Sequence, residues 1–296
     1  MARSPDRTAN GGNDAQPQAS LTDAAGRAVI FLHIPKSGGT TLHAIIERQY
    51  PAERIFTIDG HHVRESIAEF KALPEAERRR LQVLKGHMSF GLHNWLPQPS
   101  TYITLLRDPV ERTISHYYHI LRSPEHTHHA TIVGKNMSLH DFMLAGVSRI
   151  VDNGQVRALC AGEDVPYGAC TADMLAQAQA NIEGHFTLVG FTEQFDETLI
   201  LLKRALGWKM DAYLRRNVGL NRPAAESVPA ATRSLIEQIN EFDFGLYHAA
   251  EKRFAATIAG LGDAFVSDLD RFQRRASLRH SPVVTGAVRL LRRLGR

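Results

Sequence analysis

The chain has little cysteine, no long apolar run and no apolar segment at its beginning. Only Cys160 and Cys170 occur among 296 residues, too few for a fold built on disulfide bonds. No run of about 18 apolar residues is present, so no transmembrane helix is predicted. The first 27 residues are polar and lack the apolar core of a secretory signal peptide. These absences favour a cytoplasmic protein with reduced thiols over an exported or membrane-spanning one.

Acidic residues are missing from the end of the chain. The net charge is +4, yet eight arginines and no Asp or Glu lie from Arg271 onward, so the remainder is net negative. The basic character therefore belongs to a tail and does not indicate a nucleic-acid-binding face. We expect a disordered lead-in over residues 1–27, one folded domain over residues 28–270 and a basic tail over residues 271–296. Such a tail can contact an acidic membrane surface or a neighbouring subunit.

The stretch Ala28–Leu42, AVIFLHIPKSGGTTL, predicts a binding site for an anion. Its apolar start, Val29–Leu32, is typical of a buried parallel strand, and Ser37–Gly39 permits a tight turn. Thr40–Thr41 are expected to cap a following helix. A strand, a glycine turn and a helix N-terminus direct backbone N–H groups at a phosphate, with Lys36 at the mouth. In a Walker A loop the lysine follows the glycines, whereas here it precedes them.

A histidine follows another expected buried strand. His87 comes after Leu81–Leu84 and a glycine. Because ligands of open α/β sheets bind at the carboxyl ends of the strands, His87 is expected to face the same crevice as Lys36. A neutral imidazole is a suitable general base near pH 7. His61–His62, which follow the expected strand 54–58, remain rival bases, and His33 is expected to point into the sheet.

A third strand, Thr101–Leu106, runs directly into Arg107. Pro109 suits the first position of a helix that Asp108 can cap. Ser115 lies about two turns along this helix. A guanidinium and a hydroxyl at a strand end predict a second anion site of a different construction from the glycine loop.

The remaining pattern is mostly helical, including a helix expected over residues 245–258, with one further strand over Phe186–Phe191. Strands alternating with helices predict an α/β fold of the P-loop-like, three-layer type, with a central, mainly parallel sheet flanked by helices and a helix-rich C-terminal half. His126–His129 lack a partner cluster with zinc-site spacing, so we expect a mobile surface loop there and no metal site.

Together these segments resemble the carbohydrate sulfotransferases. Phe31–Thr41 looks like their 5′-phosphosulfate loop, and Leu106–Arg112 with Ser115 resembles their 3′-phosphate motif. Gly86–Phe90 resembles the segment that carries the catalytic histidine in the uronosyl (heparan sulfate) 2-O-sulfotransferase group. The similarity covers roughly residues 28–260. The chain departs from that group in having no membrane anchor and in having Lys85 where a second histidine is common.

This resemblance implies an enzyme that uses 3′-phosphoadenosine 5′-phosphosulfate as co-substrate and no metal. A sulfuryl group would pass in line to a hydroxyl of a saccharide, glycolipid or related acceptor. His87 would be the general base, and Lys36 would stabilise the leaving oxygen. Arg216 and Arg222 are candidate late contacts to the 3′-phosphate. The residues that the resemblance implies for donor binding are Lys36, Ser37, Gly38, Gly39, Thr40, Thr41, Arg107 and Ser115.

Two other functions stay open at this point. A P-loop kinase of small molecules is disfavoured by the position of Lys36 and by Arg107, which stands where an acidic metal ligand would be expected. A non-catalytic nucleotide-binding protein with the same fold would bind the donor without turnover.

Overall fold

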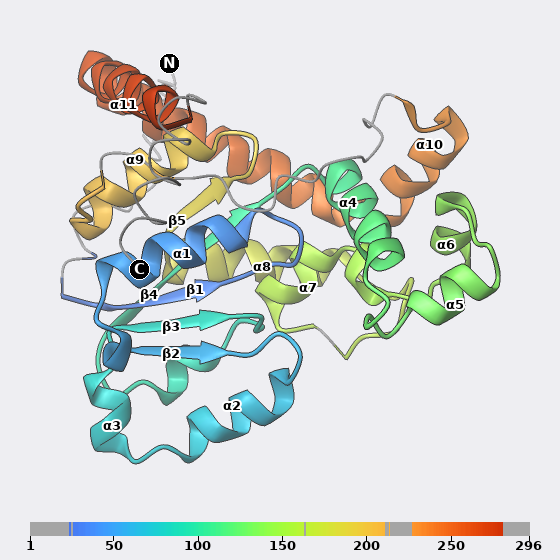
Figure 1. The fold of residues 1–296 in the computed structure, drawn as a ribbon, viewed down its shortest axis with the longest axis horizontal. Coiled ribbons are helices and arrows are strands. Elements are labelled where there is room, and N and C mark those ends of the chain that lie inside the picture. Colours follow the sequence, from blue (N-terminus) through green and yellow to red (C-terminus); the bar gives the residue numbers. More distant parts are fainter. Residues whose placement is uncertain (1–23, 25, 163, 211–212, 214–226, 281–296) are drawn as a thin grey trace, which may run out of the picture.

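A computed structural model describes residues 24, 26–162, 164–210, 213 and 227–280. At its centre lies a five-stranded sheet in the order β2-β3-β1-β4-β5 (Figure 1), and every neighbouring pair of strands is parallel. The strands are β1 (Ala28–Leu32), β2 (Ile55–Ile58), β3 (Val83–Gly86), β4 (Ser100–Leu106) and β5 (Phe186–Phe191). The prediction of an α/β fold with a central parallel sheet is confirmed.

The middle strand β1 is buried along its whole length, as its unbroken apolar sequence predicts. It pairs with β3 on one side and with β4 on the other. The predicted starts of β1, β2 and β4 each differ by one residue from the observed ones. The start of β3 differs by two: it begins at Val83 and not at Leu81, because Leu81 caps the end of a preceding helix. The strand consequently runs on to Gly86, next to the predicted base His87.

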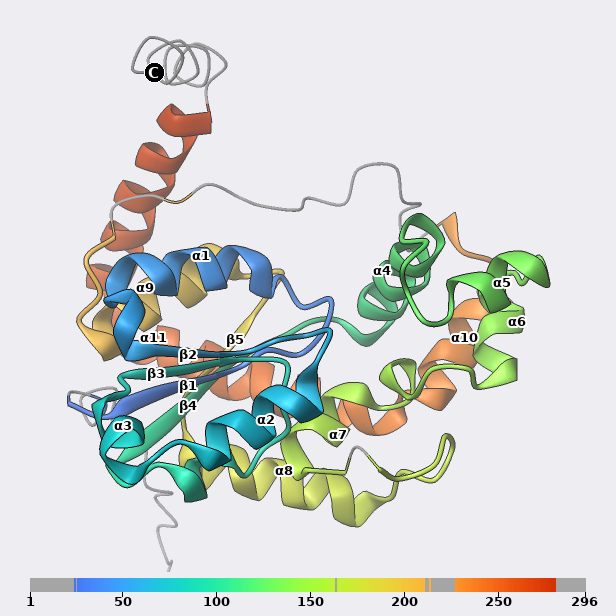
Figure 2. The same cartoon turned by 60° about the horizontal axis from the view of Figure 1, so that its bottom comes forward.

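Helices cover both faces of the sheet. Figure 2 shows α1 (Gly39–Gln49) and α9 (Phe195–Leu206) on one face. The helices on the other face are α2 (Val63–Ala72), α3 (Glu75–Arg80) and α8 (Ala172–His185). Short 3-10 helices cover Ala52–Arg54, Leu92–Trp95 and Arg149–Val151.

A second group of helices lies beyond the carboxyl ends of the strands (Figure 1). It comprises α4 (Pro109–Arg122), α5 (His129–Gly134), α6 (Leu139–Ala145) and α10 (Ala230–Ile239). These helices share an apolar core of their own, which includes Ile114, Phe142 and Ile236. The helix α7 (Gly154–Cys160) packs against α8. The carboxyl edge of the sheet therefore faces a helical wall.

The last helix of the described chain, α11, is longer than predicted. A helix was expected over residues 245–258, whereas α11 spans Glu241–His280, with a break in its helical conformation at Gly262. It continues past residue 271, where the basic tail was expected to begin. Residues 281–296 of that tail and residues 1–23 of the lead-in lie outside the described residues.

A fully buried ion pair joins the helical group to the rest of the fold. Arg112 Nη2 on α4 lies 3.2 Å from Asp243 Oδ2 on α11. Asp243 also accepts hydrogen bonds from the backbone N–H groups of Gln155 and Val156 at the start of α7. The side chain of Gln155 in turn bonds the backbone N–H and C=O of Arg107. One carboxylate thus fixes α4, α7 and the end of β4.

We expect Arg112→Met to lower the free energy of unfolding by about 3–5 kcal/mol, because it leaves Asp243 buried without its charged partner. Urea denaturation measures the change. Arg149→Met, at an exposed arginine of the neighbouring 3-10 helix, is the matched control and should stay within about 0.5 kcal/mol of the wild type. A loss below about 1 kcal/mol in Arg112→Met would contradict the role given to the pair.

Candidate active site

The glycine loop forms between β1 and α1 with two residues in the left-handed region. Lys36 has φ 69° and Gly38, which caps α1, has φ 77°. The expectation that Thr40–Thr41 cap the helix is wrong. The helix already begins at Gly39, so both threonines lie within its first turn. That turn has no acidic residue and no side-chain cap, which leaves the positive end of α1 open to an anion.

The hydroxyl of Ser37 fits an anion at this loop. Its Oγ is fully buried and has no hydrogen-bond partner among the residues that the structure describes. Buried hydroxyls without a partner are rare in folded proteins, so each calls for an explanation. A phosphate or sulfate oxygen at the N-terminus of α1 would supply the missing partner.

Arg107 connects the end of β4 to the glycine loop. Its Nη1 donates to the backbone oxygen of Lys36 at 3.0 Å, and its Nη2 donates to Glu111 Oε2 at 2.9 Å. Asp108 accepts from the backbone N–H of Glu111 at 2.9 Å, so the predicted cap of α4 is present. Ser115 is half-buried further along α4. The two predicted anion motifs are therefore in direct contact through Arg107.

His87 lies on the other side of the loop. Its Nδ1 is 3.0 Å from the backbone oxygen of His33. Because a carbonyl oxygen only accepts, Nδ1 carries the proton of the neutral ring and the lone pair is on Nε2. Burial is the main cause that lowers the pKa of His87, and the positive charge of Lys36 lowers it further. The ring is therefore neutral at pH 7 and able to accept a proton at Nε2.

His33 was expected to point into the sheet, but it occupies the base of the loop. Its ring stacks on that of His87 with centroids 4.2 Å apart and an interplanar angle of 24°. A Cβ atom on Gly39 would lie 2.1 Å from the His33 ring, and one on Gly60 would lie 2.5 Å from His87. Glycine at these two positions therefore makes room for the histidine pair. The sequence pattern did not predict this position of His33. The signal that could have indicated it is glycine at positions 39 and 60, where a side chain would overlap with the histidine rings.

The rival bases His61 and His62 lie on the surface of the protein. Both are exposed, and Asp59 bonds the backbone N–H of His61 and the ring of His62. They follow β2, the edge strand next to β3. Of the histidines weighed as bases, only His33 and His87 are substantially buried beside the loop.

The histidine-rich stretch is more ordered than expected. His129 begins α5, and its Nδ1 lies 2.8 Å from the backbone oxygen of Ile120, so the prediction of a mobile loop is wrong for this residue. Across the described residues, no three or more side chains gather as a metal site. Arg216 and Arg222 lie outside the described residues.

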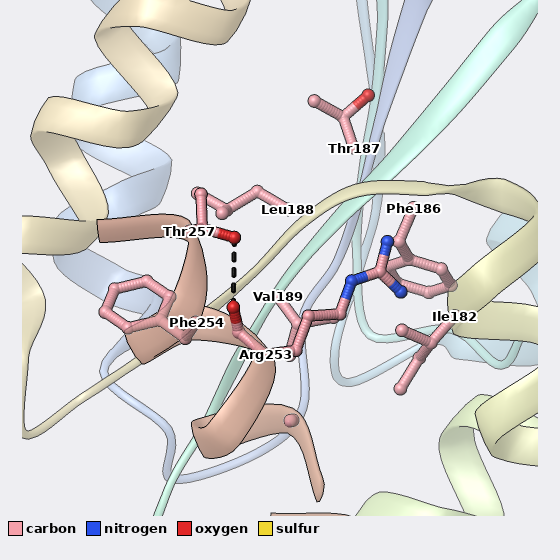
Figure 3. A pocket seen from close by; sticks show the side chains of 9 residues that line it. Ile182, Phe186, Thr187, Leu188, Val189, Arg253, Phe254 and Thr257 are labelled. Carbon is pink, nitrogen blue, oxygen red and sulfur yellow. Dashed lines mark hydrogen bonds between the residues drawn. The ribbon is translucent and has the colours of Figure 1, made fainter. Parts of the chain in front are cut away.

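A small cleft of about 50 Å³ between α8, β5 and α11 lies elsewhere (Figure 3). Its lining is mainly apolar, with Ile182, Phe186 and Phe254, and the stem of Arg253 crosses it. It adjoins the first residues of β5, whereas the predicted site lies at the carboxyl ends of β1, β3 and β4. The cleft is thus separate from the predicted site.

Three curated relatives are similar to this chain over most of its length. Galactose-3-O-sulfotransferase 3 of Homo sapiens is 28% identical over 284 residues, which cover 85% of this chain and 62% of the relative. Heparan-sulfate 6-O-sulfotransferase 3-B of Danio rerio is 27% identical over 271 residues, covering 76% and 63%. Heparan sulfate 2-O-sulfotransferase 1 of Xenopus laevis is 22% identical over 207 residues, covering 65% and 58%. The chain spans about three fifths of the length of these relatives.

One solved structure, that of mouse sulfotransferase SULT7A1 complexed with PAP, aligns with a TM-score of 0.39 and 16% sequence identity. The alignment covers 74% of this chain and 65% of that chain. This likeness is too weak to support an inference.

The sequence profile of the galactose-3-O-sulfotransferases matches residues 5–285. The predicted kinship with carbohydrate sulfotransferases is therefore confirmed, and the 2-O-sulfotransferases are among the relatives. The expectation of a cytoplasmic protein is wrong, because galactose-3-O-sulfotransferases are Golgi membrane enzymes. Within the described ranges, no helix has both the length and the apolar character needed to cross a membrane. Since the profile extends over nearly all of its 296 residues, this chain belongs to the galactose-3-O-sulfotransferase family.

Proposed function

We propose that the chain transfers a sulfuryl group from 3′-phosphoadenosine 5′-phosphosulfate to a hydroxyl of a saccharide or glycolipid. The observation that carries this proposal is the hydrogen bond from Arg107 to the backbone oxygen of Lys36, which joins two anion motifs at neighbouring strand ends. A donor with separate 5′ and 3′ anionic groups requires two such motifs side by side. Membership of the galactose-3-O-sulfotransferase family supports the same donor.

The residues of the glycine loop would hold the 5′ end of the donor. The backbone N–H groups of Gly38, Gly39 and Thr40 and the hydroxyl of Ser37 would surround the 5′-phosphate, with Lys36 beside the bridging oxygen. Arg107 and Ser115 would bind the 3′-phosphate from β4 and α4. This second clamp would distinguish the donor from ATP.

When bound, the donor supplies an activated sulfuryl group with a phosphate leaving group. His87 Nε2 would accept the proton of the attacking hydroxyl, and the His33 carbonyl would hold the opposite nitrogen protonated during this step. Lys36 would stabilise the negative charge that develops on the leaving oxygen. Positioning and charge stabilisation together account for this class of transfer, by analogy with phosphoryl transfer.

The acceptor is proposed to be a glycan hydroxyl. The relatives are named for transfer to galactose and to heparan sulfate, both saccharides. The basic segment from residue 271 onward would contact an acidic membrane surface or a neighbouring subunit.

The first test compares nucleotides in the presence of EDTA. The wild-type protein should bind 3′-phosphoadenosine 5′-phosphate without metal and more tightly than ADP or ATP. Arg107→Ala should lose about 10- to 150-fold in affinity, because a hydrogen bond to a charged group contributes about 1.5–3 kcal/mol. Arg149→Ala is the control and should bind like the wild type. A preference for ATP that requires Mg²⁺ would instead identify a kinase.

The second test separates binding from catalysis. His87→Asn should lower kcat by about 10²–10⁴-fold, and Lys36→Ala by about 10²–10³-fold, in assays with a galactose-terminated acceptor. His87→Asn should keep the wild-type affinity for 3′-phosphoadenosine 5′-phosphate, the product that the donor leaves after transfer. His61→Asn and His62→Asn are matched controls with little expected effect. Equal turnover in wild type and His87→Asn would favour a different base, and no turnover in either would favour a non-catalytic binding protein.

The third test uses pH. A base must be neutral, and the pKa of His87 is lowered, so kcat/KM should be flat around pH 7 and fall only below the ordinary histidine value of about 6.5. Lys36→Met removes a positive charge that lowers this pKa, so the acidic limb should move to higher pH. Steady-state rates of the wild type and of Lys36→Met between roughly pH 4.5 and 8 measure the acidic limb of each protein. The lower end of this range lies roughly two pH units below the ordinary histidine pKa. An acidic limb at the same pH in both proteins would contradict the assignment.

A further inference from the structure

A chain of hydrogen bonds runs from Lys85 to the base of the glycine loop. Lys85 Nζ lies 3.2 Å from His43 Nδ1, and His43 Nε2 lies 3.0 Å from His33 Nδ1. Lys85 belongs to β3, His43 to α1, and His33 follows β1. Lys85 is buried, and it forms an ion pair with the exposed Glu47 at 2.9 Å. The proposed mechanism gives no role to Lys85 or to His43.

The lysine fixes the direction of donation along this chain. An ammonium group donates and cannot accept, so His43 Nδ1 must accept from Lys85. The proton of the neutral His43 ring is therefore on Nε2, from which it is donated to His33 Nδ1. This leaves the proton of the neutral His33 ring on its own Nε2. The positive charge of Lys85 thus determines the tautomers of two successive imidazoles.

The last nitrogen of this hydrogen-bond chain, His33 Nε2, lies against the glycine loop. A Cβ atom on Gly39 would be 2.1 Å from His33 Nε2, so this nitrogen lies against the first residue of α1. An N–H group at this position attracts an anion, whereas a lone pair would repel it. The tautomer that Lys85 imposes is the one that suits an anionic ligand.

The imidazoles of His33 and His43 both stay neutral, as the hydrogen-bond chain requires. Burial is the main cause that lowers the pKa of His33, and His87, His43, Lys36 and Lys85 each lower it further. Burial, Lys85 and His87 lower the pKa of His43 to about 3. The carboxylate of Glu47 is the acidic group that pairs with this cluster, through Lys85.

We propose that Lys85 is a positioning residue which, through His43, fixes His33 as an N–H donor to the 5′-phosphosulfate end of the donor. The inference rests on the proposed function, since that donor supplies the anion. It assigns a role in binding to His33 and gives a physical task to the lysine that stands two residues before His87.

The test combines histidine tautomers with affinity for 3′-phosphoadenosine 5′-phosphate. Long-range ¹H–¹⁵N spectra of the wild type at pH 7 should show His43 and His33 protonated on Nε2 and His87 protonated on Nδ1. In Lys85→Met the His43 and His33 signals should change. The affinity should fall about 10- to 150-fold, the effect of losing one hydrogen bond to a charged group. Lys85→Arg keeps a charged donor and should retain the wild-type tautomers and most of the affinity.

Lys203→Met, at an exposed lysine on α9, is the control for loss of a lysine charge and should bind like the wild type. Wild-type His43 protonated on Nδ1 would overturn the proposal even if Lys85→Met failed to fold. So would unchanged affinity in a folded Lys85→Met protein. A wild type that shows these tautomers but does not bind the nucleotide would overturn the proposed function, and with it the binding role of His33. Nucleotide binding with reversed tautomers would overturn only the inference.

Discussion

The buried carboxylate of Asp243 is the contact on which the arrangement of the strand ends depends. It bonds the guanidinium of Arg112 and the backbone at the start of α7, and through Gln155 it holds the backbone of Arg107. A buried charge is tolerated only when it is paired and hydrogen-bonded, so these elements have little freedom to move independently. The fold thereby holds Arg107 within reach of the glycine loop.

Space is the second constraint at the site. Two stacked histidines lie between Gly39 and Gly60, and a methyl group at either glycine would overlap with a ring. Burial in this crowded site lowers the pKa of both imidazoles and so keeps them neutral, and His87 donates from Nδ1 to the backbone carbonyl of His33. The packing around His87 thus sets the protonation state that a general base needs.

Much of the sheet could be read from the residues, because buried parallel strands are short apolar runs with turn residues behind them. The strand Phe186–Phe191 was predicted with its observed bounds, and so was the Asp108 cap. Predictions failed where a neighbouring element decided the outcome. Gly38, in the left-handed region, starts α1 before the threonines that were expected to cap it, and Leu81 ends α3 where a strand was expected to begin.

The sequence by itself determined the α/β class, the family resemblance and the strand ends that carry Lys36, His87 and Arg107, since each depends on residues close together in the chain. Only the tertiary structure decided which distant groups meet. Asp243 is 131 residues from Arg112, and Lys85 is 42 residues from His43. No local pattern encodes such contacts, because the order of the strands and the packing of helices on the sheet select the partners. The tautomers of His33 and His87 follow from those partners, so they too were beyond the reach of the sequence.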